Sequence, residues 1–82
     1  MASIAAVFAA NVRAERARRG WRQRELAERT GWSIDTISDI EGGRRRVGIE
    51  DVPRLCRAFD VTIVRLLDGA PDEDMRAMGL AS

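Results

Sequence analysis

Arginine is the side chain in this sequence that is best equipped for chemistry, and its placement is uneven. All fourteen basic residues are arginine. Residues 13–46 carry ten arginines and six acidic residues, a balance of +4, whereas residues 50–82 carry four arginines and seven acidic residues, a balance of −3. The net charge of +1 therefore hides a basic half and an acidic half. Because a guanidinium group binds phosphate through several N–H donors, the basic half predicts contact with phosphates.

Chemistry that depends on other side chains is excluded by composition. The chain has no histidine and one cysteine, Cys56. It therefore lacks the usual ligands of a zinc site and the base of a histidine-containing catalytic triad, and it cannot form an internal disulfide. No nucleophile–base pair or phosphate-loop motif is visible, so we expect neither an enzyme nor a cofactor. We expect Cys56 to be a small core residue.

Length and hydropathy place further bounds on the chain. Its 82 residues predict one domain. No apolar run approaches the ~20 residues that a membrane helix needs. The first four residues have no basic segment before their apolar residues, so they do not resemble a secretory signal. These features predict a cytoplasmic protein without membrane contact.

The elements that must position the arginines are predicted to be helices. Tyrosine is absent and there are only two Trp and two Phe, so Ala, Leu, Ile and Val must build the core, and no alternating β-branched run predicts a strand. We expect five helices: residues 3–19, a second from residue 23 to a break at 31–32, a third up to residue 41, and then 50–59 and 63–67. Residues 70–82 are expected to form either a short amphipathic helix or a flexible tail.

The second and third predicted helices flank the break at Gly31-Trp32. Leu26 in the second predicted helix, and Ile37 and Ile40 in the third, can face inward, while polar residues occupy the opposite faces. Ser33 is suited to cap the start of the third helix. Two helices joined by a short turn that contains Gly have the sequence form of a helix-turn-helix.

This stretch resembles the helix-turn-helix domains of the Cro and lambda-repressor type (XRE family), and the resemblance extends from residue 8 to residue 67. The matching pattern is Gln23-x-x-Leu26-Ala27-x-x-x-Gly31-x-Ser33-x-x-Thr36-Ile37-Ser38-x-Ile40-Glu41-x-Gly43-x-Arg45. The resemblance implies an all-α, compact five-helix lambda-repressor-like domain over residues 1–69. It also implies a nucleoid-associated, sequence-specific DNA-binding transcriptional regulator, a small repressor of phage or mobile-element type that binds palindromic operator DNA as a dimer.

In this fold the second helix of the motif enters the major groove of double-stranded DNA. The residues expected to face the base edges are Ile34, Asp35, Ser38 and Asp39. The two carboxylates depart from the family, which more often has Gln, Arg, Ser or Asn there. They can accept from the cytosine N4 amine, but they also repel the surrounding phosphates. The sequence thus leaves open a preference for C-rich sites or a weaker or different docking.

Phosphate contacts are expected on both sides of this helix. The residues expected to make them are Arg22, Gln23, Thr36, Arg44, Arg45 and Arg46. The role of Gln23 follows from the resemblance alone. The alternative for the Arg44-Arg45-Arg46 run is an ordinary solvated charge cluster.

The resemblance also implies a structural ion pair between Arg16 and Glu41. Arg16 continues the apolar stripe of Ile4, Phe8 and Val12, so its charge falls on the inner face of the first helix. The alternative is that both charges are solvated.

Two further expectations concern partners. In related regulators the last helices often form the dimer contact, and the candidate residues are Val64, Leu67, Met75, Met78 and Leu80. The alternative function is a protein-interaction module, such as an antitoxin or a regulator subunit of the same fold, because the acidic half could bind a basic protein.

Overall fold

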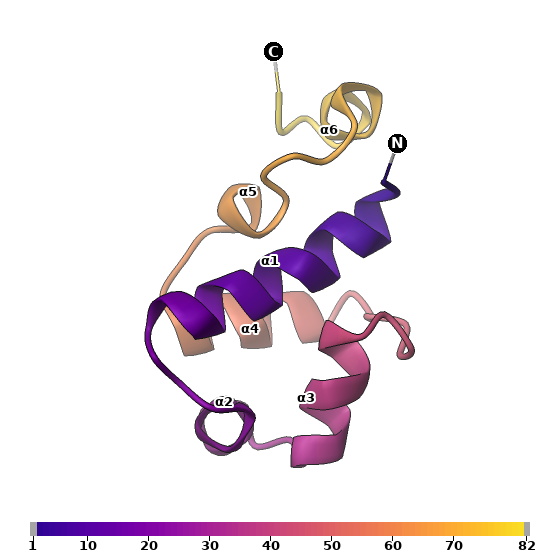
Figure 1. Ribbon diagram of the computed structural model, residues 1–82. Coiled ribbons are helices and arrows are strands. Elements are labelled where there is room, and N and C mark those ends of the chain that lie inside the picture. Colours follow the sequence, from indigo (N-terminus) through magenta and orange to yellow (C-terminus); the bar gives the residue numbers. More distant parts are fainter. Residues whose placement is uncertain (1, 82) are drawn as a thin grey trace.

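The computed structural model describes residues 2–81, and all the regular elements in that range are helices. They are α1 (Ile4–Arg18), α2 (Gln23–Thr30), α3 (Ile34–Glu41), α4 (Asp51–Phe59), α5 (Ile63–Leu66) and α6 (Asp72–Ala77). The predicted all-α class is confirmed: five helices lie before residue 70, and α6 is a sixth, short helix beyond them (Figure 1). Residues 1 and 82, the outer ends of the expected ranges, lie outside the described residues.

Three helices begin at capping side chains that the sequence makes recognisable. The hydroxyl groups of Ser3, Ser33 and Thr62 each accept a hydrogen bond from the backbone N–H three residues later. Helix α2 has no such cap, because Arg22 stands at that position. Its start is held instead by the carboxylate of Glu25, which accepts from the backbone N–H of Arg22 at 3.2 Å.

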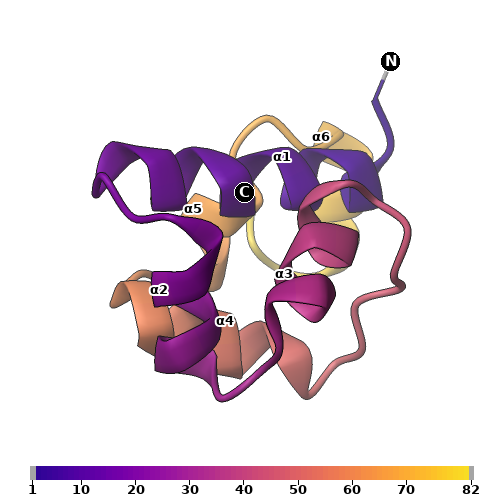
Figure 2. The same ribbon diagram turned by 60° about the horizontal axis from the view of Figure 1, so that its bottom comes forward.

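The core is built by α1 to α5 together. Its largest fully buried side chains are Val12, Leu26, Ile37, Ile40, Leu55 and Leu66. Each of the five helices contributes at least one of them, so α3 cannot be positioned without its neighbours. Figure 2 shows α2 and α3 on the same side of α1, with residues 42–50 leading from α3 round to α4.

The C-terminal residues extend this core. Ala70 and Met75 are each 9 % exposed and belong to the same buried cluster as α1 to α5, and Leu80 packs against it. Of the two expectations for this segment, the structure has the short helix, α6, which lies beside the N-terminal end of α1 (Figure 1). Among residues 2–81, no helix has both the length and the apolar character needed to cross a bilayer.

Two of the five candidate dimer residues are therefore wrong. Leu67 is 5 % exposed and Met75 is 9 % exposed, because both side chains fill the core of their own chain. Val64 and Met78 are each 46 % exposed and Leu80 is half-buried, so these three remain accessible. An apolar residue in the last helices was not by itself a sign of an unpartnered surface.

Candidate nucleic-acid interface

The turn between α2 and α3 is fixed by local hydrogen bonds. The Thr30 hydroxyl donates to the Leu26 carbonyl at 2.8 Å and accepts from the backbone N–H of Trp32 at 3.3 Å. Gly31 between them has φ of +81°, a left-handed conformation that glycine adopts without a steric penalty. The chain therefore leaves α2 and starts α3 within three residues, as a helix-turn-helix requires.

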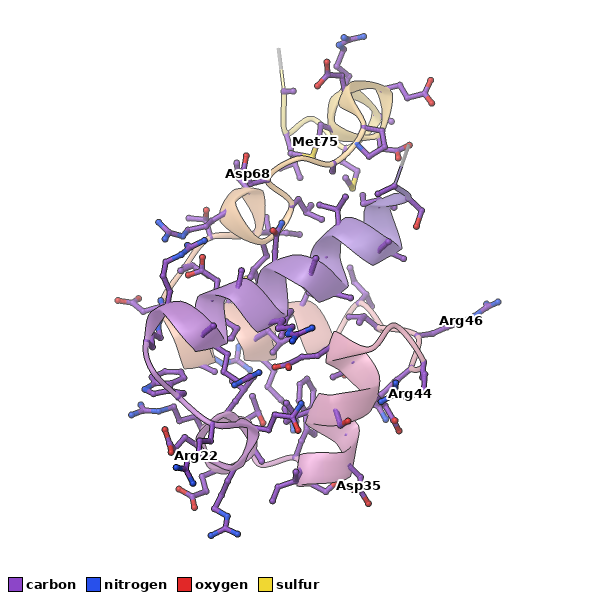
Figure 3. The ribbon with its side chains drawn as sticks, in the orientation of Figure 1. Arg22, Asp35, Arg44, Arg46, Asp68 and Met75 are labelled. Atoms are coloured by element: carbon purple, nitrogen blue, oxygen red, sulfur yellow. The ribbon has the colours of Figure 1, made fainter. Side chains whose placement is uncertain are left out.

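The outer face of α3 carries the four residues expected to read bases. Ile34 is 42 % exposed, Asp35 is exposed, and Ser38 and Asp39 are half-buried. They lie opposite Ile37 and Ile40, whose side chains fill the core. Figure 3 shows Asp35 at the N-terminal end of α3, pointing away from the rest of the chain.

Arg44 lies against this face instead of pointing away from it. Its Nε donates to Asp39 Oδ1 at 3.1 Å, and its Nη2 donates to the Ser38 carbonyl at 3.0 Å and to Ser38 Oγ at 3.2 Å. The sequence pattern predicts Arg44 at a phosphate and Ser38 and Asp39 at base edges. The structure instead joins the three residues into one group, which we call the Arg44 cluster.

The two glycines after α3 shape the loop that brings Arg44 back. Gly43 has φ of +71°, as expected for the exit from the helix. Gly42 has an ordinary helical φ of −85°, so its backbone does not require glycine. A Cβ at Gly42 would lie 2.3 Å from Nη1 of Arg44, so the missing side chain leaves the space that the guanidinium occupies.

The other arginines expected at phosphates differ in how they are held. Arg45 lies 3.8 Å from Asp51 Oδ2 and 6.0 Å from the centre of the Trp32 ring. Within residues 2–81, no hydrogen bond or ion pair engages the side chains of Arg22 and Arg46. Figure 3 places Arg22 and Arg46 on opposite sides of α3. Their charges are therefore accessible on both flanks of the exposed face.

Thr36 and Gln23, the two uncharged residues expected at phosphates, both have partners within the chain. Thr36 is half-buried, and its Oγ1 accepts from Ser33 Oγ at 3.0 Å. The side-chain amide of Gln23 is turned inward and donates to Glu41 Oε1 at 3.2 Å. Gln23 thus supports the end of α3 in this structure.

Arg16 and Glu41 are paired as the resemblance implies. Arg16 Nε donates to Glu41 Oε2 at 2.7 Å and Nη2 donates to Oε1 at 3.1 Å. The third nitrogen, Nη1, donates to the Trp21 carbonyl at 2.7 Å. The side chains are only 16 % and 5 % exposed, so the pair ties α1, the start of α2 and the end of α3 together in a shielded position.

Glu15 is a second buried charge, and it was not among the residues predicted from the sequence. Its side chain is 3 % exposed, and its carboxylate binds Arg18 at 2.5 Å, Arg19 at 2.8 Å and Arg65 at 2.9 Å. Burial raises the pKa of this carboxyl, but the hydrogen bonds from Arg19 and Arg65 and the charge of Arg18 outweigh it, so the pKa lies below its ordinary value. The spacing of Arg18 and Arg19 from Glu15 on the same helix could have indicated these ion pairs, whereas no sequence spacing indicates the pair with Arg65 in α5.

An apolar groove lies away from α3, between α4 and α5. Its walls include Val52, Cys56 and Ile63, and Ile49 at its edge is 84 % exposed. Burial raises the pKa of the Cys56 thiol. The thiol therefore stays protonated, as expected for a residue that packs against its neighbours. Among the described residues, no three His, Cys, Asp or Glu side chains gather into a possible metal site.

Comparison with known proteins agrees with this geometry. A family model described as a helix-turn-helix domain matches residues 7–68. A protein named "Neisseria hypothetical transcription factor", from Neisseria meningitidis serogroup B, is 31 % identical over 75 residues, which cover 92 % of this chain and 70 % of the relative.

Two solved structures resemble most of this chain. The hypothetical transcription factor NHTF from Neisseria has a TM-score of 0.75 at 28 % identity, over 93 % of this chain and 85 % of that one. The clp gene regulator ClgR from C. glutamicum has a TM-score of 0.76 at 29 % identity, over 83 % of this chain and 88 % of that one.

Proposed function

Because the chain belongs to the helix-turn-helix domain family, we propose that it is a transcriptional regulator that binds double-stranded DNA with α3 in the major groove. The observation that carries the proposal is the exposed face of α3 with an arginine on each flank whose side chain makes no hydrogen bond or ion pair within residues 2–81. Arg22 lies before α2 and Arg46 lies beyond α3, and both side chains are free to reach phosphates. Phosphate contacts of this kind set the register of a protein on DNA, and residues between them read the bases.

The rigid support of α3 favours the same function. The pairing of Glu41 with Arg16 and Gln23 holds the C-terminal end of α3, and the Ser33 cap holds its start. A reading helix that is fixed at both ends loses little conformational freedom when it docks. The relatives named as transcription factors and regulators support this assignment.

We propose further that two copies of the chain form a two-fold dimer, and that this dimer represses transcription from a palindromic operator. One small domain buries a limited interface with DNA, so specific affinity usually needs two copies, with half-sites ~34 Å apart. Val64, Met78 and Leu80 are the accessible candidates for the contact between copies. Sedimentation equilibrium with and without a palindromic duplex measures the number of chains in each state. A complex with one chain per palindrome would contradict the dimer.

The test of DNA binding is a titration of labelled random-sequence duplex, followed by fluorescence anisotropy at several salt concentrations. We expect the logarithm of the binding constant to fall linearly with the logarithm of salt concentration, because binding releases counterions from the phosphates. The double variant Arg22→Ala/Arg46→Ala should flatten that slope by about two phosphate contacts. Absence of binding even at low salt would reject the proposal and favour a protein-interaction module.

A further inference from the structure

The starting observation is the direction in which Arg44 points. Arg46 extends from the loop away from the chain, whereas Arg44 is labelled beside α3, on the side that also carries Asp35 (Figure 3). Its guanidinium group lies over Ser38 and Asp39, which are two of the four positions expected at base edges. A ligand that contacts Ser38 or Asp39 on this face of α3 also meets the guanidinium of Arg44.

The hydrogen bonds of Arg44 leave donors for a ligand. Nε and one N–H of Nη2 are engaged by the Asp39 carboxylate and the Ser38 carbonyl. Within residues 2–81, no hydrogen bond engages Nη1. The 3.2 Å bond from Nη2 to Ser38 Oγ is one that a stronger acceptor could replace. The two terminal nitrogens can therefore offer a pair of parallel N–H donors.

Guanine is the base that matches such a pair. In the major groove it presents two acceptors, O6 and N7, and a bidentate arginine is the commonest specific contact to them. We propose that Arg44, held by Asp39 and Ser38, is a base-reading residue that selects guanine. The inference rests on the proposed DNA-binding function, and it moves Arg44 from the phosphate contacts to the specificity contacts.

This arrangement also accounts for Asp39, one of the two acidic residues in the groove-facing set. A free Asp39 carboxylate would be repelled by the phosphates on both sides of the groove. In the structure its charge is compensated by Arg44, and the carboxylate orients the guanidinium plane. The side chains of Arg44 and Asp39 are 61 % and 50 % exposed, so the pair adds little to stability but stays accessible to a base.

Gly42 provides independent support. Its backbone is in the ordinary helical region, so glycine is not needed there for conformation. A methyl group at this position would lie 2.3 Å from Nη1 and would displace the guanidinium from α3. Gly42→Ala is therefore a variant that moves Arg44 while it leaves every charge in place.

The experiment has two steps. Duplexes that bind the protein are first selected from a random pool, and the affinity for the selected site is then measured. The wild type should prefer a G·C pair at one fixed position of the site by about 5- to 150-fold. Because a cytosine read by Asp39 gives the same base pair, the selected site is then made with 7-deazaguanine, which lacks the N7 acceptor. Binding through Arg44 should weaken on this substitution, whereas binding of Asp39 to the cytosine N4 amine should not.

Three variants and one control complete the test. Arg44→Lys keeps the charge but loses the planar fork, so it should weaken the preference for G·C and the sensitivity to 7-deazaguanine while the salt dependence is retained. Asp39→Asn and Gly42→Ala should reduce both effects. Arg76→Lys in α6, the control outside the proposed interface, should leave the selected sequence and the sensitivity to 7-deazaguanine unchanged. Circular dichroism melting of each variant verifies that it is folded.

Two results would overturn the inference. The first is that Arg44→Lys keeps the full G·C preference and that the wild type binds the 7-deazaguanine site as tightly as the unmodified one. Arg44 would then be a phosphate contact, and the proposed DNA binding would be unaffected. Failure of the wild type to bind any duplex at low salt would overturn the proposed function together with this inference.

Discussion

Arg16 in α1 and Glu41 at the end of α3 are joined by two hydrogen bonds of 2.7 and 3.1 Å, and the Glu41 side chain is 5 % exposed. The pair therefore links α1 to the end of α3. Removing one partner leaves the other charge shielded from water and unpaired, which is more costly than loss of an exposed pair.

Arg16→Ala should accordingly lower the free energy of unfolding by about 3–5 kcal/mol, measured by urea denaturation. Arg13→Ala is the matched control, because Arg13 is exposed on the same helix, and it should change stability by less than about 0.5 kcal/mol. The double variant Arg16→Met/Glu41→Leu should be more stable than Arg16→Ala. Equal stability of Arg16→Ala and Arg13→Ala would show that the pair contributes nothing.

Glu15 should make the stability depend on pH in the acidic range. Its native pKa is lowered from an ordinary value of 4.5, so the folded state binds its proton less readily than the unfolded state. The stabilisation is therefore fully present above about pH 4.5 and is lost as the pH falls through the lower native pKa. Melting temperatures from pH 6 to pH 2.5 should show a smaller decline for Glu15→Gln than for the wild type.

Glu15→Gln should also be less stable than the wild type at pH 7, because the three arginines lose their shared carboxylate. Glu28→Gln is the control, since Glu28 is exposed on α2 and makes no ion pair within residues 2–81. Parallel pH profiles of wild type and Glu15→Gln would refute the linkage.

Arg46 should act on DNA affinity and not on sequence preference. Its side chain is exposed and points away from α3, so Arg46→Ala should weaken binding to all duplexes and reduce the salt slope by about 1. Arg45→Ala should likewise weaken binding to all duplexes and reduce the salt slope. Arg76→Ala in α6, far from α3 in Figure 1, should leave the slope as it is in the wild type. A loss confined to one selected sequence would assign Arg46 to base reading.

Ser33 should matter through the start of α3. Its Oγ accepts from the Thr36 N–H at 3.1 Å, so Ser33→Ala should cost about 1 kcal/mol of unfolding free energy. Ser33→Asp keeps an acceptor at the cap and should retain most of that stability. Chemical denaturation of the three proteins measures the difference, and a loss in Ser33→Asp as large as in Ser33→Ala would exclude capping as the cause.

Local patterns predicted much of the fold because their causes lie within a few residues. The cap at Ser33 and the turn at Gly31 depend on the residue itself and its immediate neighbours. Helix α6 was left undecided, because its stability depends on burying Met75 against residues distant in sequence. The same reason made Leu67 and Met75 misleading as dimer candidates.

In the candidate interface, too, some features follow from the sequence and others only from the tertiary structure. The sequence by itself determined which residues occupy the outer face of α3, because helical periodicity and the position of the turn decide it. Only the tertiary structure decided where their charges are compensated. Arg44 reaches Asp39 through a loop that turns at Gly43 and leaves space for the guanidinium at Gly42, and Glu15 meets Arg65 from a helix fifty residues away. Sequence spacing specifies neighbours on one helix, but contacts between segments exist only after the core has fixed their relative positions.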